Sequence, residues 1–112
     1  MSGNLFAGLP DAGAGEVFET LLTLPAVRIE RIVSHGQATP EGEWYDQRQG
    51  EWVLLLAGGA GLQLEGEAGP RRLLPGDYLY LPPRCRHRVA WTDAGQVTVW
   101  LAVHIDSEAA AP

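Results

Sequence analysis

Residues 76–89 read Gly-Asp-Tyr-Leu-Tyr-Leu-Pro-Pro-Arg-Cys-Arg-His-Arg-Val, and this stretch decides the fold. Pro75-Gly76 and Pro82-Pro83 mark turns on either side of a short run of Tyr and Leu, which is typical of a β-strand. Side chains in the run that follows alternate between two faces, the three arginines on one and the residues between them on the other: Cys85, His87 and Val89. Because solvated guanidinium groups prefer water, we expect His87 to point into the protein.

Glycine and proline turns of the same kind continue along the whole chain of 112 residues, which contains 14 Gly and 8 Pro. The short segments between the turns are rich in Val, Leu, Trp and Tyr, a pattern typical of an all-β sandwich or barrel. We expect strands at 27–34, 44–47, 51–56, 61–65, 71–73, 77–81, 87–91 and 97–105. A helical turn is expected over 16–22, because the apolar residues there can share one helical face and Pro25 follows: Val17, Phe18, Leu21 and Leu22.

The length and spacing predict one all-β domain over 1–112. Its barrel core is expected at about 27–105, after an N-terminal arm and short helix within 1–25 and before a frayed tail at 107–112.

Charge and composition exclude several classes of function. There are 14 acidic residues against 8 basic ones, and all eight cations are arginine. Chemistry that needs a lysine Schiff base or a phosphate-loop lysine is therefore excluded, and an acidic chain without a basic run is a poor partner for nucleic acid. No apolar run is long enough to cross a bilayer and no leader pattern is present, so we expect a cytoplasmic protein without a membrane partner.

The segment Glu51-Trp-Val-Leu-Leu-Leu56 has apolar residues on both faces. Glu51, Val53 and Leu55 share one face, while Trp52, Leu54 and Leu56 share the other. In a small domain the second face needs a cover of its own, so we expect a homodimer through it or, failing that, the predicted helix packed over it.

Three polar side chains are expected inside the apolar barrel, namely Gln47, Glu51 and His87. A buried carboxylate must be paired, protonated or bound to a metal. A carboxylate, an imidazole and an amide oxygen that converge are suitable ligands for a divalent first-row metal. The alternative is that Glu51 and His87 hydrogen-bond each other or an arginine.

Two motifs in these segments resemble those of the cupin family. Glu51-Trp-Val-Leu-Leu-Leu-Ala-Gly58 is similar to the second half of the first cupin motif, and Gly76 to Pro82 followed by His87 is similar to the second motif. The resemblance extends over Val27 to Ile105 and implies a single jelly-roll or β-barrel domain whose mouth holds a divalent ion such as Zn, Mn, Fe or Ni.

Carried over to this chain, the resemblance implies that Glu51 is the glutamate ligand and His87 the second-motif histidine. The paired histidines of the first motif fall on Tyr45 and Gln47, so neither is present. Arg84 stands where the second motif has a glycine, and Trp91 stands where it has an asparagine.

A pocket for a small, partly apolar ligand is expected at the barrel mouth. Tyr45 and Trp91 hold mouth positions of the matched motifs, while Val53 shares the face of Glu51 and Val89 that of His87. His104 lies on the less apolar face of the last strand and is expected outside the barrel or at an interface.

Other candidate residues carry weaker signals. His35 is expected in a solvated loop, and Cys85 as a buried, inert thiol.

Two functions follow from these expectations. The first is a metal-dependent enzyme of oxygenase or isomerase type, in which the ion and its open positions act on a small organic substrate. The second is a metal-free barrel that serves as a small-molecule binding or sensor module, and the missing histidine pair supports it. A third possibility, a purely structural dimer, has only the apolar face of Trp52, Leu54 and Leu56 behind it.

Overall fold

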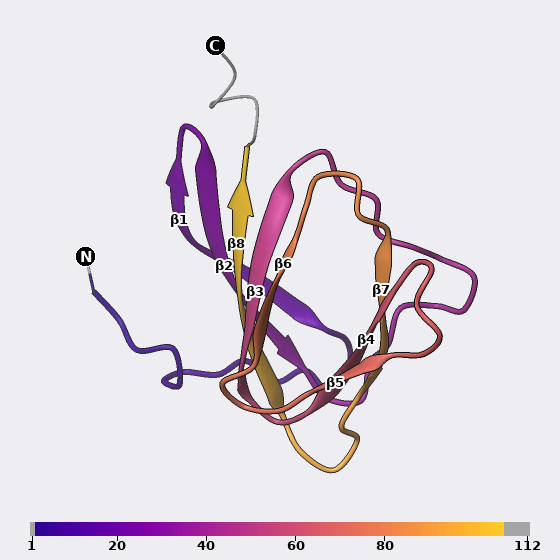
Figure 1. Cartoon of the computed structure of the whole chain (residues 1–112). Coiled ribbons are helices and arrows are strands. Elements are labelled where there is room, and N and C mark those ends of the chain that lie inside the picture. Colours follow the sequence, from indigo (N-terminus) through magenta and orange to yellow (C-terminus); the bar gives the residue numbers. More distant parts are fainter. Residues whose placement is uncertain (1, 107–112) are drawn as a thin grey trace.

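Eight antiparallel strands form the regular structure of residues 2–106, the part of the chain that the computed structural model describes (Figure 1). They are β1 (Val17–Leu24), β2 (Val27–Ser34), β3 (Gly50–Ala57), β4 (Ala60–Leu64), β5 (Arg71–Leu73), β6 (Tyr78–Leu81), β7 (His87–Thr92) and β8 (Thr98–Ile105). Five of them form a large sheet in the order β1-β2-β8-β3-β6, and three form a small sheet in the order β5-β4-β7.

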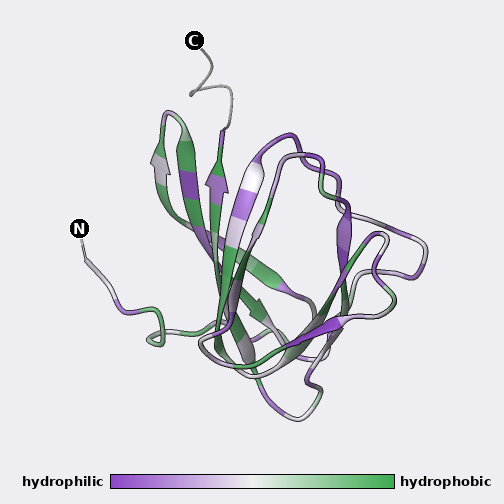
Figure 2. Ribbon diagram, in the orientation of Figure 1, coloured by the Kyte–Doolittle hydropathy of each residue, from purple (hydrophilic) through white to green (hydrophobic). Residues whose placement is uncertain are grey.

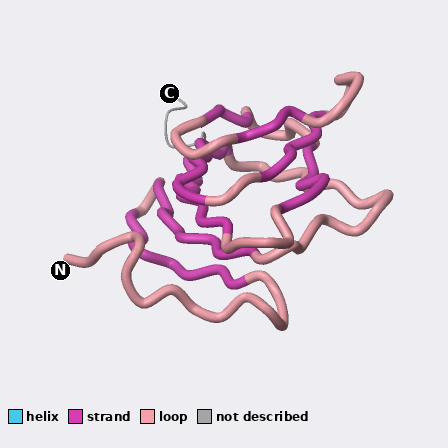
Figure 3. Tube along the Cα trace, turned by 90° about the horizontal axis from the view of Figure 1, so that it is seen from below, coloured by secondary structure: helices cyan, strands magenta, loops and turns pink. Residues whose placement is uncertain are grey.

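The chain between residues 2 and 106 contains strands and loops only, as Figure 3 shows, which confirms the prediction of an all-β fold. Accordingly, this part of the chain has no helix that could span a membrane. The tail predicted at 107–112 lies outside the described residues.

The helix predicted over 16–22 is wrong, because this segment belongs to β1. It pairs with β2 from Val17 opposite Val33 to Leu24 opposite Val27, and Pro25 and Ala26 form the turn between the two strands. The register shifts between Thr20 and Leu22, so a bulge lets adjacent apolar residues fit a strand as well as a helical face. Pairing along a whole neighbouring strand outweighs the weak helical pattern of so short a segment.

The strand predicted at 44–47 is reduced to one isolated bridge, between Tyr45 and His87. The remaining predicted strands are present, each within a residue or so of its expected ends.

The core lies between the two sheets and draws side chains from both. It consists of Val53, Leu55, Leu81 and Trp100 from the large sheet and Ala60, Leu62 and Leu73 from the small one. Towards one end of the large sheet, hydrophilic residues interrupt the apolar strands β2, β3 and β8 (Figure 2). The large sheet is therefore apolar in the middle and more polar at that end.

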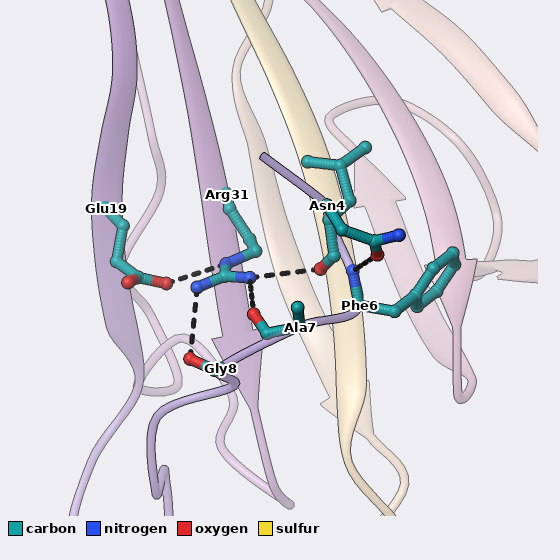
Figure 4. A network of polar contacts seen from close by, with 7 residues as sticks. Asn4, Phe6, Ala7, Gly8, Glu19 and Arg31 are labelled. Atoms are coloured by element: carbon teal, nitrogen blue, oxygen red, sulfur yellow. Dashed lines mark hydrogen bonds and ion pairs between the residues drawn. The ribbon is translucent and has the colours of Figure 1, made fainter. Parts of the chain in front are cut away.

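The N-terminal arm lies across the outer face of β2 and β8, where Arg31 holds it (Figure 4). The Arg31 side chain donates hydrogen bonds to the backbone carbonyls of Leu5, Ala7 and Gly8 and pairs with Glu19 at 2.8 Å. This contact fixes the path of a segment that has no regular structure of its own.

The outer face of β3 carries the half-buried side chains of Trp52, Leu54 and Leu56. The Trp52 ring lies 5.6 Å from the ring of Tyr78, which is itself exposed. No helix covers this face in residues 2–106, so that alternative is wrong. The homodimer through this face stays a prediction.

Candidate functional site

A cavity of about 410 Å³ opens between the two sheets. Its apolar lining includes Ile32, Val53, Leu62, Leu81, Val89 and Trp100. Its polar wall is formed by Glu16, Arg28, Glu30, Tyr45, Gln47, Glu51, His87 and His104. A site of this size with convergent polar groups suits a small organic ligand.

A row of polar residues crosses the large sheet at this end. Arg28 on β2 lies opposite His104 on β8, and His104 lies opposite Glu51 on β3. Residues opposite one another in a sheet point to the same face, so the three side chains belong to one surface. The apolar residues nearer the middle of the same strands, Ile32, Trp100 and Leu55, form the parallel row below.

Glu51, His87 and Gln47 come together at one side of the cavity. His87 Nε2 lies 3.8 Å from Glu51 Oε1, and Gln47 Nε2 donates a hydrogen bond of 3.1 Å to the same oxygen. Glu51 and His87 are both more than nine-tenths buried. The structure therefore brings together the three residues that the sequence nominated as metal ligands.

The tautomer of His87 follows from its other nitrogen. His87 Nδ1 lies 2.9 Å from the backbone carbonyl oxygen of Cys85. A carbonyl can only accept, so Nδ1 carries the proton and the neutral ring has a free electron pair on Nε2. That electron pair faces the carboxylate of Glu51.

Backbone hydrogen bonds hold the Gln47 loop against the turn that precedes β7. Tyr45 and His87 exchange two such bonds, of 2.7 and 3.1 Å, and the Arg84 amide donates to the Gln47 carbonyl at 2.7 Å. Arg84 has a φ of 63°, in the left-handed region that favours glycine. This explains why a glycine is the expected residue there, and the arginine adopts the same turn at a conformational cost.

Tyr45 stacks on the ring of His87, with 5.4 Å between the ring centroids and 21° between the planes. Burial raises the pKa of its phenol, and the nearby carboxylates, led by Glu16 and Glu51, raise it further. The phenol therefore stays neutral and can donate a hydrogen bond to a ligand in the cavity.

Sequence reasoning missed a second polar pair, which lies beside Glu51 on the same sheet. His104 Nε2 lies 2.8 Å from Glu30 Oε1, and both side chains are more than nine-tenths buried. The prediction that His104 lies outside the barrel is wrong. The more apolar face of β8 instead points outward, with Val99 on it buried beside Val33 of β2.

Glu16 adds a third carboxylate to the cavity. It accepts a short hydrogen bond from the Ser34 hydroxyl. Burial raises the pKa of its carboxyl group, and the bond from Ser34 opposes this effect. Arg28, Glu30 and Ser34 are polar residues at even-numbered positions of β2, which is a weak sequence signal for Glu30, whereas Glu16 precedes β1 and has no such signal.

The remaining nominated residues have clear positions. Tyr45, Val53 and Val89 line the cavity. Trp91, which we expected at the pocket, is not among the lining residues. Its indole lies over Gly61, where an added Cβ would be 2.7 Å from the Trp91 Cδ1 atom. His35 is exposed, and Cys85 is half-buried against the core.

In the described part of the chain, no group of three His, Cys, Asp or Glu side chains gathers where it could hold a metal ion. The Gln47 amide adjoins Glu51 through its nitrogen, and rotation of the terminal amide group would turn its oxygen to the same place. Imidazole nitrogen with carboxylate and amide oxygen is a donor set that fits a divalent first-row ion.

Comparisons with solved structures find proteins of similar overall structure. A protein from Ralstonia eutropha JMP134, described as a candidate mannose-6-phosphate isomerase, is 54% identical, with 95% of this chain and 98% of that chain covered and a TM-score of 0.91. A cupin superfamily protein from Desulfitobacterium hafniense DCB-2 is 15% identical, covering 87% and 83% of the two chains with a TM-score of 0.71. An RmlC-like cupin from Shewanella frigidimarina NCIMB 400 is 16% identical, covering 94% and 88% with a TM-score of 0.72. No family model matches the chain, and no curated protein matches it.

Proposed function

The chain belongs to the cupin family, and on that premise we propose that it binds a divalent metal ion through Gln47, Glu51 and His87 and a small organic ligand in the adjoining cavity. Zn, Mn, Fe and Ni are the ions that suit this donor set. The name of the Ralstonia protein makes sugar isomerisation the first activity to assay, since that protein is 54% identical to this one.

One observation carries the proposal. His87 Nε2 and Glu51 Oε1 are both electron-pair donors, and they face each other across 3.8 Å in a buried place. Two such groups repel one another unless a positive species lies between them. A metal ion supplies that charge and keeps His87 in the tautomer that its bond to Cys85 already selects.

The residues around this centre support ligand binding. When bound, the ion would act as a Lewis acid on an oxygen of the ligand. Tyr45 limits rotation of the His87 ring by stacking on it and offers a neutral hydroxyl donor. The apolar wall, which includes Val53 and Leu81, excludes water from one side of the ligand.

A metal-free binding module is the second candidate. The observation that favours it is the replacement of both first-motif histidines, at Tyr45 and Gln47. In that case the positive species between His87 and Glu51 is a proton, and the two side chains form a buried ion pair.

Metal analysis of the full chain, purified without a histidine tag, distinguishes the two candidates. The protein is reconstituted with Mn, Fe, Ni or Zn, dialysed and analysed for bound metal. The variants Glu51→Ala and His87→Ala remove one ligand each and put no other donor in its place. His35→Gln is the matched control, because His35 is exposed and lies outside the cavity.

The proposal predicts close to one ion per chain in the parent protein and in the His35→Gln variant, and a loss of metal in the other two variants. A parent protein that retains none of the four metals establishes the metal-free module instead. Metal that persists in both ligand variants places the ion elsewhere and contradicts the assignment.

A further inference from the structure

Arg28 is the one arginine that lines the cavity. Its side chain is half-buried, and its Nε atom is buried without a hydrogen-bond partner. Among residues 2–106, Arg28 has neither a hydrogen bond nor an ion pair through its guanidinium group. An arginine without a partner next to a cavity is unusual, because its five donors cost free energy when they are left unmatched.

The acidic residues around the cavity do not supply the missing partner, because each has its own. Glu16 accepts from Ser34, Glu30 pairs with His104, and Glu51 accepts from Gln47. Three carboxylates therefore lie in the same cavity as Arg28, and none of them forms an ion pair with it. The positive charge of the Arg28 guanidinium group is therefore available to pair with a ligand that enters the cavity.

Arg28 and the proposed metal centre lie at opposite sides of one polar surface. Arg28 is on β2 and Glu51 is on β3, with His104 of β8 between them in register. Neighbouring strands are spaced by about 4.8 Å, so the backbones of Arg28 and Glu51 lie about 10 Å apart. Side chains that lean inward from both positions can hold the two ends of one small ligand.

We propose that Arg28 is the anchor for an oxyanion, a carboxylate or a phosphate group, at one end of the ligand in this cavity. This inference rests on the proposed function, because it takes the cavity to be the ligand site. The planar guanidinium matches both oxyanions through two parallel hydrogen bonds, which neither lysine nor histidine can offer.

The charges around the cavity determine which end of the ligand lies at Arg28. Glu51, on the opposite side of this surface, repels an anion there, so the negative group of the ligand is stabilised at the Arg28 end. The other end carries hydroxyl or carbonyl oxygens, which meet Tyr45 and the Glu51–His87 side. The ligand class is therefore a small hydroxylated compound with one terminal carboxylate or phosphate.

Three six-carbon probes test the anchor by calorimetric titration of the full chain at low ionic strength: mannose, gluconate and mannose 6-phosphate. They carry no charge, a carboxylate and a phosphate, respectively. They are titrated into the parent protein and into the variants Arg28→Gln and Arg28→Lys. Arg72→Gln is the matched control, since Arg72 is an exposed arginine on β5 outside the cavity.

The inference predicts that at least one anionic probe binds the parent protein more tightly than mannose. Arg28→Gln weakens that probe about 10- to 100-fold, the range for loss of a charged, bidentate contact, and changes mannose affinity less than about 2-fold. Arg28→Lys keeps the positive charge but loses the two parallel N–H donors of the guanidinium group, so it gives an intermediate affinity. Arg72→Gln has the same affinities as the parent protein. The probe with the larger loss identifies the oxyanion as phosphate or carboxylate.

Three results would overturn the anchor: anionic probes that bind no tighter than mannose, an Arg28→Gln variant that weakens all three probes equally, or no binding of any probe. The metal content of the same samples reports separately on the metal centre. Charge discrimination without metal leaves the anchor standing and the metal assignment refuted. Bound metal without a difference between charged and uncharged probes supports the metal centre and refutes the anchor.

Discussion

The pair formed by Glu30 and His104 leads to a prediction about stability. The two side chains meet at 2.8 Å, and each is more than nine-tenths buried. In Glu30→Leu the His104 ring loses its acceptor, and in His104→Leu a buried carboxylate loses its donor. Removing one member of a buried pair costs about 3 kcal/mol, because the other is left desolvated and unmatched.

The double variant Glu30→Leu/His104→Leu leaves no unmatched group behind. Its destabilisation is therefore smaller than the sum of the single variants, by an interaction energy of about 2 kcal/mol. Urea unfolding followed by tryptophan fluorescence and circular dichroism measures all four proteins. With a slope of about 2 kcal/mol/M, each single variant lowers the midpoint by about 1.5 M.

The control for this cycle is the exposed ion pair between Glu67 and Arg71, whose atoms lie 2.7 Å apart. Solvent screens this pair, so Glu67→Leu and Arg71→Leu are expected to show no measurable coupling. Additive effects at Glu30 and His104, within about 0.5 kcal/mol, would refute the reasoning that burial makes their contact strong.

Two further predictions concern Glu16 and Gly58. Burial raises the pKa of Glu16 above its ordinary value of 4.5, so the folded state holds this proton more tightly than the unfolded state does. The contribution of this proton to the free energy of unfolding is therefore fully present below pH 4.5 and is lost as the pH rises through the pKa of the folded state. Glu16→Gln should flatten this part of a stability profile measured from pH 4 to 8, whereas Glu41→Gln, at an exposed turn, should not; an unchanged slope in Glu16→Gln contradicts the assignment. Gly58 has a φ of 85°, and a Cβ there would lie 2.6 Å from Thr98 Cα and 2.7 Å from the Val97 oxygen. Gly58→Ala should therefore cost about 3 kcal/mol in urea unfolding, from backbone strain and overpacking together. Gly66→Ala, with a φ of 91° and open space around it, should cost only about 1 kcal/mol, and equal losses at the two positions would show that the close contact contributes nothing.

The parts of the site that the sequence predicts are those set by local rules. Alternation of side chains along a strand places Glu51 and His87 inside, and both are buried in the structure. Turns at Gly76 and Pro82 delimit β6 within two residues. These features depend on a few neighbouring residues, so a single sequence contains enough information to find them.

The parts that the sequence misses depend on contacts between distant segments. His104 and Glu30 are 74 positions apart. Both faces of β8 contain apolar residues, so its alternation does not reveal which face is inside. The N-terminal arm, which Arg31 holds on the outer face of the sheet, is one such distant contact, and its path has no sequence signal.

The segment of β1 illustrates the same limit. Its apolar residues fit one face of a helix, but they also fit a strand with a bulge near Leu21. Its pairing with β2 decides between the two, and this pairing is a property of the whole sheet rather than of the eight residues themselves.

The most direct test of the central claim is a crystal structure of the full chain grown with Zn or Mn, with diffraction recorded on both sides of the metal's absorption edge. The account predicts an anomalous peak bonded to His87 Nε2, to a carboxylate oxygen of Glu51 and to the amide oxygen of Gln47. A peak at other residues contradicts this account. So does a cavity without a peak in which His87 and Glu51 have closed to a direct hydrogen bond.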